Sequence, residues 1–364
     1  HSLSIGGSGG GGGDGGMVGV TNASGSSIAT KAYVSYGILA QSIGGGGGAT
    51  GNRTSLVNGD GIAANIALRV GGSDGASGDG GTVTVKNTAT TVSTAGRAAI
   101  GIFAQSIGGG GGLSSDGLDD ATGTIVVTGS SSASLSTKGN GGSVNVVHDG
   151  SVVSGNTGTT RSSVASHGIV AQSVGGGGGY AGSVVMGPTA NFGLQTLTSQ
   201  GPSGTGGDVT VVATGDITTN GGSSVGIFAQ SVGGGGGVSG NTDNNSDAGA
   251  YIGSAGGSGK SGVVSVTYGN QTKSRLRTAF DSVTAPGAHG IFAQSIGGLG
   301  TTTTGTQVSV TVNQPITTPG AGSFGVYAQS GGDGMGAIDV TINRTASVTG
   351  GANATIPDAE DGAA

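Results

Sequence analysis

One phrase, of the form G-I-x-A-Q-S followed by a run of glycines, recurs along this chain of 364 residues. Self-similarity at a fixed period is the sequence signature of solenoids, propellers and other repeat architectures. The repeat therefore constrains the fold more than any single residue does. Its copies lie at 37–48, 101–112, 168–179, 226–237, 290–298 and 325–332, and the intervals between their glutamines are 64, 67, 58, 64 and 35 residues.

A second phrase, of the form GDGGTVTV, precedes most of these copies, and a weaker apolar segment lies between them. Apolar and polar residues alternate in TVTVK and in IFAQSI, and no segment sustains a period of 3.6 residues. This pattern predicts β-strands, three per full unit, and almost no α-helix. The second phrase lies at 13–22, 78–87, 139–147, 204–212, 259–268 and 306–312, and the weaker segment lies at 63–70, 124–128, 183–186 and 250–253.

The fold that fits these strands best is all-β, a right-handed parallel β-solenoid (β-helix) with stacked glycine-rich turns. A sandwich or a propeller also uses short strands at regular spacing, but propeller blades hold four paired strands and usually carry a tryptophan or bulky aromatic signature, whereas this chain has no Trp. We expect three turns of roughly 20 residues in each repeat, which makes a rod on the order of 80 Å long.

We expect residues 1–350 to form the solenoid and residues 351–364 to be a linker or the start of a next segment. The short sequence Pro357-Asp358-Ala359-Glu360-Asp361 marks that change. The chain as a whole is expected to be a piece of a longer protein. The repeats fall at about 1–48, 49–112, 113–179, 180–237, 238–300 and 301–332, with a partial repeat at 333–350.

Composition narrows the choice of function. The chain has 88 Gly but only 6 Pro, and its glycines come in runs, which excludes collagen. The absence of Cys excludes disulfides, thiolate metal sites and cysteine nucleophiles. Its 12 cationic residues are too dispersed for a nucleic-acid partner, and no apolar run predicts membrane insertion by this segment.

Two rows of side chains recur at fixed places in the AQS phrase. An apolar row would point inward, and alternation puts a glutamine row on the opposite face together with Phe103 and Phe228. Alternation alone leaves open which face is the interior. The apolar row is Ile38, Ile102, Ile169, Ile227, Ile291 and Val326, and the glutamine row is Gln41, Gln105, Gln172, Gln230, Gln294 and Gln329.

The runs of five glycines need an account of their own, because glycine in a strand costs about 0.5–1 kcal/mol relative to alanine. We expect the runs to stack as extended backbone without side chains, and to offer flat faces for lateral contacts between copies. The alternative is that they are mobile loops. The glycines that bound the runs are Gly44, Gly48, Gly108, Gly112, Gly175, Gly179, Gly233 and Gly237.

The combination of GDGG, TVTV and GIFAQSIGGGGG resembles the repeated passenger region of large bacterial autotransporter adhesins, and the resemblance covers roughly residues 1–350. Gram-negative bacteria secrete such proteins through a C-terminal outer-membrane barrel. The resemblance implies an extracellular, β-helical stalk on the bacterial cell surface, anchored by a barrel in the parent chain. This sequence departs from the pattern at 297–300, where the glycine run is broken as GGLG, and in its short last repeat.

Apparent catalytic and nucleotide-binding motifs are readily produced by chance in so glycine-rich a sequence. GSGKS at 257–261 lacks the first glycine of a phosphate-binding loop, and no helix follows it. The GxSxG matches around Ser8 and Ser73 lie in glycine-rich turns. His167 and His289 share a repeat position with Tyr36 and Phe324, which indicates a tolerant packing or surface position. We therefore expect no catalytic residue and no resident cofactor.

Structural calcium is the one metal that the sequence leaves open, because GGxGxDxUx repeats bind Ca²⁺ in parallel β-rolls. Asp14 and Asp79 resemble that pattern, but the position becomes Asn140 and Thr205 in later copies, so no ladder of carboxylates persists. The acidic residues that could form a cluster are Asp74, Asp79, Asp116, Asp119 and Asp120.

A β-helical polysaccharide-active enzyme is the main enzymatic alternative, and it needs paired carboxylates in one groove. Asp119 and Asp120 are adjacent, but neighbouring strand residues point to opposite faces. The basic residues Lys273, Arg275 and Arg277 are interpreted as a solvated loop.

We therefore expect a structural or adhesive surface stalk that is not an enzyme. Its partners would be other copies of itself, neighbouring surface proteins, or host and abiotic surfaces. A second hypothesis is a filament subunit whose copies stack end to end, because a solenoid without polar caps exposes pairing edges at both ends.

Overall fold

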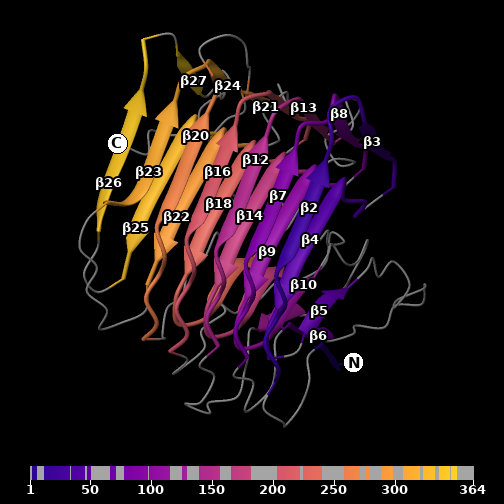
Figure 1. Ribbon diagram of the computed structural model, residues 1–364, viewed down its shortest axis with the longest axis vertical. Coiled ribbons are helices and arrows are strands. Elements are labelled where there is room, and N and C mark those ends of the chain that lie inside the picture. Colours follow the sequence, from indigo (N-terminus) through magenta and orange to yellow (C-terminus); the bar gives the residue numbers. More distant parts are fainter. Residues whose placement is uncertain are drawn as a thin grey trace, which may run out of the picture.

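The computed structural model is an all-β parallel solenoid of seven coils, in which the described residues hold no helix. The coils stack in sequence order, from the N-terminal side of the molecule to the C-terminal side (Figure 1). The structure describes residues 2–5, 12–32, 34–45, 47–50, 66–70, 78–96, 98–114, 125–128, 139–155, 165–181, 203–221, 224–239, 258–270, 276–278, 288–297, 306–319, 323–332, 336–344 and 346–350.

The second phrase forms the first sheet, which we call the TVTV sheet. Its residues alternate between inward-facing valines and outward-facing residues such as Thr84 and Lys86, as the sequence predicts. The strands are β2 (Val18–Asn22), β7 (Val83–Asn87), β12 (Val144–His148), β16 (Val209–Ala213), β20 (Val264–Tyr268), β23 (Thr306–Val312) and β26 (Ala337–Ile342), paired in this order.

A sheet of short strands follows the TVTV sheet in every coil. Polar sequences such as TVST and SVVS place only one or two side chains of each strand in the interior, so their alternation is easily overlooked. The strands of this short-strand sheet are β3 (Ser27–Thr30), β8 (Thr91–Thr94), β13 (Ser151–Ser154), β17 (Asp216–Thr219), β21 (Leu276–Thr278), β24 (Ile316–Thr318) and β27 (Val348–Gly350).

The recurring AQS phrase forms the third sheet, the AQS sheet, whose interior strands are buried on both faces. A parallel strand covered on both sides has no solvent-facing alternation, which explains its near-continuous apolar and uncharged sequence. The strands are β4 (Ile38–Ile43), β9 (Ile102–Ile107), β14 (Ile169–Val174), β18 (Ile227–Val232), β22 (Ile291–Ile296) and β25 (Val326–Gly331).

Two smaller sheets add a second layer to the early coils. The glycine sheet consists of the ends of the glycine runs and the residues after them, in β5 (Gly47–Thr50), β10 (Gly111–Ser114), β15 (Gly178–Ala181) and β19 (Gly236–Ser239). The fifth sheet contains β1 (Ser2–Ile5), β6 (Ile66–Val70) and β11 (Ile125–Thr128). Of the weaker strands expected from the sequence, those at 63–70 and 124–128 contain β6 and β11, and those at 183–186 and 250–253 lie outside the described residues.

Each repeat is a single coil, and the expectation of three turns per repeat is wrong. Every strand pairs with its own counterpart in the next repeat: Ile102 lies beside Ile169, and Ile169 beside Ile227. Seven strands at about 4.8 Å spacing make the stack about 30 Å deep along its axis, not 80 Å. The three strands of one repeat therefore lie around the axis instead of along it.

The two lengths of repeat differ in the second layer. Ile107 and Val144, which bracket the second layer of one long coil, are 37 positions apart, whereas Ile296 and Val308 are only 12 apart. The short coils still contribute strands to the TVTV, short-strand and AQS sheets. A coil of three strands is therefore sufficient for stacking, and the glycine run with its following segment is an addition.

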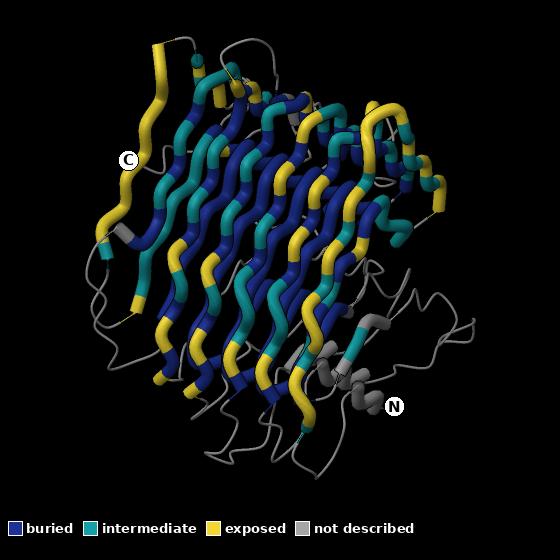
Figure 2. Tube along the Cα trace, viewed as in Figure 1, coloured by how far each residue is buried: buried dark blue, intermediate teal, exposed yellow. Residues whose placement is uncertain are grey.

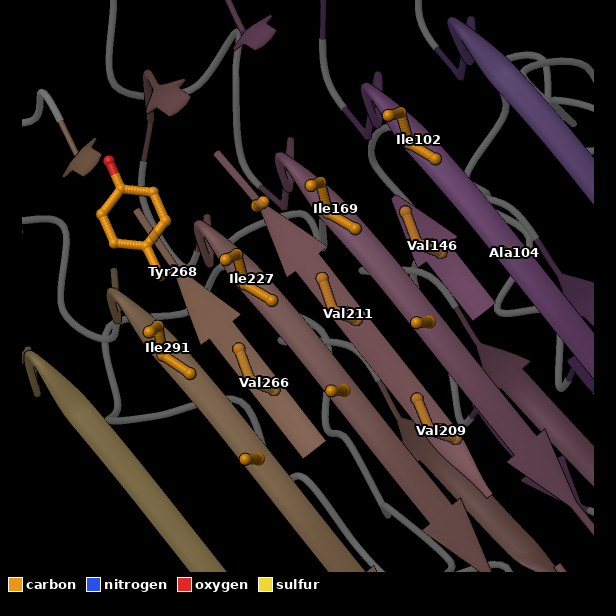
Figure 3. Packing of buried hydrophobic residues seen from close by; sticks show 14 of the residues in the cluster. Ile102, Ala104, Val146, Ile169, Val209, Val211, Ile227, Val266, Tyr268 and Ile291 are labelled. Carbon is orange, nitrogen blue, oxygen red and sulfur yellow. The ribbon is translucent and has the colours of Figure 1, made fainter. Parts of the chain in front are cut away.

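The main core lies between these three sheets. The apolar row of the AQS phrase, together with its alanines, faces the inward valines of the TVTV sheet, and the row continues from coil to coil (Figure 3). Ile102, Ile169, Ile227 and Ile291 are all fully buried. Because each coil repeats the same small side chains, the core is a set of straight apolar columns.

Candidate functional site

A column of hydrogen-bonded glutamines runs through all six strands of the AQS sheet, on the face opposite the apolar row. Gln105 Nε2 donates to Gln172 Oε1 at 2.6 Å, and Gln172 Nε2 donates to Gln230 Oε1 at 2.7 Å. The same bond links Gln41 to Gln105, Gln230 to Gln294 and Gln294 to Gln329, each at 2.6 Å. Gln105, Gln172 and Gln230 are fully buried. A buried amide needs such partners, so these glutamines hold successive coils in register.

The face that carries the glutamines is an interior face as well. Phe103, Phe228 and Phe292 pack there under residues that follow the glycine runs, such as Leu113 and Tyr180. The rings of Phe103 and Tyr180 meet edge to face at 5.4 Å, and those of Phe228 and Phe292 stack at 5.0 Å. The question that alternation left open is thus resolved: both faces of the interior AQS strands β9, β14, β18 and β22 are buried, one in each layer.

The serine of the AQS phrase joins the AQS sheet to the chain entering the TVTV sheet. Ser106 Oγ donates to the Gly81 carbonyl in its own coil at 2.8 Å and accepts the Gly142 N–H of the next coil at 2.8 Å. Ser173 makes the same pair of bonds to Gly142 and Gly207. The serine column therefore links neighbouring coils through the backbone of the glycines that precede each TVTV strand.

The acidic position of the second phrase also belongs to a column. Asp14 Oδ1 accepts the backbone N–H of Asp79 at 2.8 Å, and Asp79 Oδ1 accepts that of Asn140 at 2.7 Å. Asn140 Oδ1 in turn accepts the N–H of Thr205 at 2.8 Å. An asparagine serves as well as an aspartate here, because only a side-chain oxygen is needed. Hydrogen bonding from one coil to the next thus explains why Asp or Asn occupies this position in the first three coils.

Of the five aspartates considered for calcium, the structure describes only Asp79. Asp74, Asp116, Asp119 and Asp120 lie outside the described residues, as do Lys273 and Arg275, whereas Arg277 lies in β21. Among the described residues there is no group of three or more His, Asp or Glu side chains that could hold a metal ion.

The glycine runs are ordered turns and strands. The first glycine of each run touches the carbonyl of the acidic position in the next coil: a Cβ on Gly108 would lie 2.2 Å from Asn140 O. The last glycines pair across coils, Gly112 with Gly48 and with Gly179. Gly44, Gly175 and Gly233 occupy the first place in their runs, and Gly237 pairs with Gly179 in the last.

Positive backbone angles make this segment specific to glycine. Gly109 to Gly112 have φ of +80°, +82°, +143° and +156°, a region that L side chains rarely adopt. The same run of positive φ recurs in the next two repeats. Residues 108–112, 175–179 and 233–237 are also buried, which overturns the expectation that they offer flat faces for lateral contacts. Their role in the structure is to turn the chain back over the glutamine face.

The three histidines that the structure describes are buried. Burial, together with a smaller effect of His289, lowers the pKa of His167 to about 3. Its Nδ1 accepts the N–H of Val225 at 2.9 Å, so the neutral ring carries its proton on Nε2, 2.8 Å from Tyr180 Oη. Burial likewise lowers the pKa of His289, whose Nδ1 accepts the N–H of Phe324, to about 4. These rings replace a side chain in an apolar row and bind the next coil.

His148 continues a fourth polar column, at the end of the TVTV strands. Asn22 donates to Asn87 Oδ1 at 2.8 Å, and Asn87 Nδ2 lies 2.9 Å from His148 Nδ1. Burial lowers the pKa of His148 to about 4, against the opposing effect of Asp149. All three described histidines are therefore neutral at pH 7.

Comparison with known proteins adds no relative. No protein-family model, no curated protein and no solved structure matches the chain. In the part of the chain that the structure describes, no helix has the length and apolar character to span a bilayer.

Proposed function

We propose that this chain is a structural segment of an extracellular bacterial surface stalk, of the autotransporter adhesin type, that acts through its repeat architecture and its surface contacts. One observation carries the proposal. The recurring glutamine, serine, aspartate and asparagine side chains of the described residues hydrogen-bond from coil to coil. In the described part of the chain these side chains hold the coils together, which supports a role that depends on the length and the surface of the molecule.

The stalk role also fits the interior of the coil. A column of identical small residues can be extended by any number of coils, because each coil buries only its neighbours' faces. Seven coils of this chain already vary between two lengths of repeat without disturbing the three common sheets. Such a fold tolerates changes in the number of coils, as a spacer between a cell and a contact surface requires.

The test is to locate the segment and vary its length. Antibodies against the purified chain should label intact cells of the producing bacterium, and protease added outside should remove the label. Removal of whole coils should leave surface display intact but reduce adhesion of those cells to host or abiotic surfaces. Labelling that appears only after the cells are permeabilised would contradict the extracellular location, and unchanged adhesion of the coil-deleted strain would contradict the stalk role.

A second candidate function is a subunit of a self-assembling extracellular filament, for which the last described strand of the TVTV sheet has apolar side chains that a further coil could cover. Ile338, Val340 and Ile342 of the last TVTV strand are 45%, 42% and 51% exposed. These residues occupy rows that are buried in the interior coils. The polysaccharide-active enzyme gains no such support from the described residues.

A further inference from the structure

One column of polar side chains ends inside the stack. At the end of the TVTV strands, Asn22 Nδ2 donates to Asn87 Oδ1 at 2.8 Å, and Asn87 Nδ2 lies 2.9 Å from His148 Nδ1. The next residue in this row is Ala213, which has no polar side chain. The glutamine column, in contrast, continues through all six strands of the AQS sheet. The asparagine–histidine column therefore stops between the third and the fourth coil.

The direction of the hydrogen bonds fixes which nitrogen of His148 carries the proton. Ser26 Oγ donates to Asn22 Oδ1 at 2.5 Å, so the amide nitrogen of Asn22 faces the next coil. Asn87 Oδ1 accepts the bond from that nitrogen, and Asn87 Nδ2 faces the ring. An amide nitrogen only donates, so His148 Nδ1 accepts. The neutral ring then carries its proton on Nε2, which makes Nε2 a donor.

This donor is buried and has no partner. His148 is fully buried, and in the part of the chain that the structure describes its Nε2 makes no hydrogen bond. The position does not lie at an end of the stack, because β12 is the third of seven strands and its inward residues are buried between neighbouring coils (Figure 2). Buried polar groups are nearly always bonded to the protein or to an ordered water, so this N–H requires an acceptor.

Two backbone acceptors lie near the ring. Burial has the largest effect on the pKa of His148 and lowers it, whereas Asp149 and the backbone of Asp216 and Gly150 raise it. A backbone group that favours the protonated ring accepts a hydrogen bond, so both groups are carbonyl oxygens. Neither meets the geometry of a hydrogen bond to Nε2. One N–H and two carbonyls beside the same ring are the number and kind of partners that a buried water uses.

The row leaves space for a small ligand beside the ring. Ala213 lies between two larger buried side chains, His148 and Tyr268. Its methyl group is much smaller than the amide that Asn87 has in the same row. The N–H of the ring disfavours a cation in this space, and the carbonyl oxygens disfavour an anion, because each would face charge of its own sign. Water accepts one bond and donates two, so it satisfies all three groups.

We propose that one water molecule is bound at the end of this column, where it accepts a hydrogen bond from His148 Nε2 and donates to the backbone carbonyls of Gly150 and Asp216. The water is a structural ligand that joins the ring in the third coil to the first residue of β17 in the fourth. It explains how a polar column stops at an apolar residue without the loss of a hydrogen bond. The inference concerns the interior of the molecule and does not depend on the proposed surface function.

A high-resolution crystal structure of the unsubstituted chain tests the site directly. We expect a water oxygen within hydrogen-bond distance of His148 Nε2 and of at least one of the two carbonyls. His167 is the internal control, because its Nε2 lies 2.8 Å from Tyr180 Oη and should bind no water. A direct hydrogen bond from His148 Nε2 to either carbonyl, or electron density without a water beside it, would overturn the proposal.

Two substitutions of similar shape test what the ring requires. Ala213→Asn should displace the water and extend the column, because the Oδ1 atom of an asparagine can accept the bond from His148 Nε2. Ala213→Leu excludes the water as well but offers no acceptor, which leaves a buried donor without a partner. The asparagine variant should therefore unfold at a higher urea concentration than the leucine variant, although leucine is the more hydrophobic residue.

The same pair of substitutions in a His148→Phe background is the control. Phenylalanine has no N–H, so the advantage of asparagine over leucine should disappear there. An advantage of the same size in both backgrounds would mean that His148 Nε2 is not the group that needs the acceptor. Equal urea midpoints for the two variants in the presence of His148 would contradict the proposal as well.

Discussion

At the scale of single residues, the buried histidines couple the stability of the stack to pH. His148, His167 and His289 have pKa values lowered by burial to about 4, 3 and 4, against an ordinary value of 6.5. Above pH 6.5 both the folded and the unfolded chain hold these rings neutral. Between pH 6.5 and about 4, these rings bind protons in the unfolded chain but stay neutral in the folded chain. The free energy of unfolding therefore falls as the pH falls.

We expect the midpoint of urea unfolding to drop steadily from pH 6.5 to pH 4.5, with a loss of roughly 1 kcal/mol per pH unit for each histidine. The repeat supplies the control: His148→Asn, His167→Ile and His289→Val install residues found at the same row positions in other coils. The triple variant should unfold with a much flatter dependence on pH over this range. A dependence identical to that of the unsubstituted chain would show that carboxylates, and not these rings, are responsible.

Two glycines differ sharply in what a methyl group would meet. Gly178 has φ of +126° and an added Cβ would lie 1.9 Å from Gly236 O, whereas Gly19 has open space. Gly178→Ala should therefore destabilise its coil by at least about 2 kcal/mol, since positive φ alone costs about 1–3 kcal/mol and a backbone contact is added. Gly19→Ala should change stability by less than about 0.5 kcal/mol. Hydrogen exchange of amides in β15 measures the difference, and equal protection in both variants would refute it.

At the scale of the strand, the glutamine column can be interrupted at one place. Gln172→Ala leaves a donor on Gln105 and an acceptor on Gln230 without their partner, and each such buried group costs about 1–3 kcal/mol. We expect a loss of roughly 2–6 kcal/mol in the unfolding free energy. Gln41→Ala removes one bond at a half-buried end of the same column and should cost distinctly less. If both variants lost the same amount, the column would not be acting between buried coils.

The sequence predicts best those strands whose side chains alternate against solvent. TVTV strands show this alternation because their outer face is exposed, and both their position and their inward valines follow from it. β10 begins with Gly111 and Gly112, which have no side chain to reveal a period, and β8 is four residues long. Such strands are stabilised by pairing with strands of adjacent coils. The periodicity within a single segment carries no information about that pairing, so it does not predict these strands.

The columns were visible in the sequence only as repeated letters. Gln105 and Ser106 recur in every copy of the phrase, but their recurrence alone does not distinguish an exposed adhesive surface from a buried column. The distinction depends on the chain after the glycine run, where Leu113 and Tyr180 cover the glutamine face. The pairing of like with like could have been derived: a glutamine amide offers both a donor and an acceptor, so a stack of glutamines satisfies itself.

At the scale of the whole molecule, one coil per repeat has a consequence that three turns per repeat would not have. Removing residues 102–168 joins Gly101 to Ile169 and restores the sequence GI at the junction. It also deletes one strand from each of the five sheets: β9, β10, β11, β12 and β13. β7 can then pair with β16, β8 with β17 and β4 with β14. In each row, valine would still lie beside valine or isoleucine, and glutamine beside glutamine.

We therefore expect this chain of six coils to fold, with β-sheet circular dichroism per residue and resistance to protease close to those of the full chain. The matched control removes residues 102–143, which deletes β9, β10 and β11 but leaves β12 and β13. In this variant β12 of the TVTV sheet would follow β8 of the short-strand sheet, with no AQS strand between them. The AQS sheet would lose its second strand, and the glutamine column would be broken between Gln41 and Gln172. Because stacking depends on every row continuing into the next coil, the shorter deletion should be the more damaging one, with protease cleavage near its junction. The opposite order of stability would mean that the coil is not the unit by which this molecule is built.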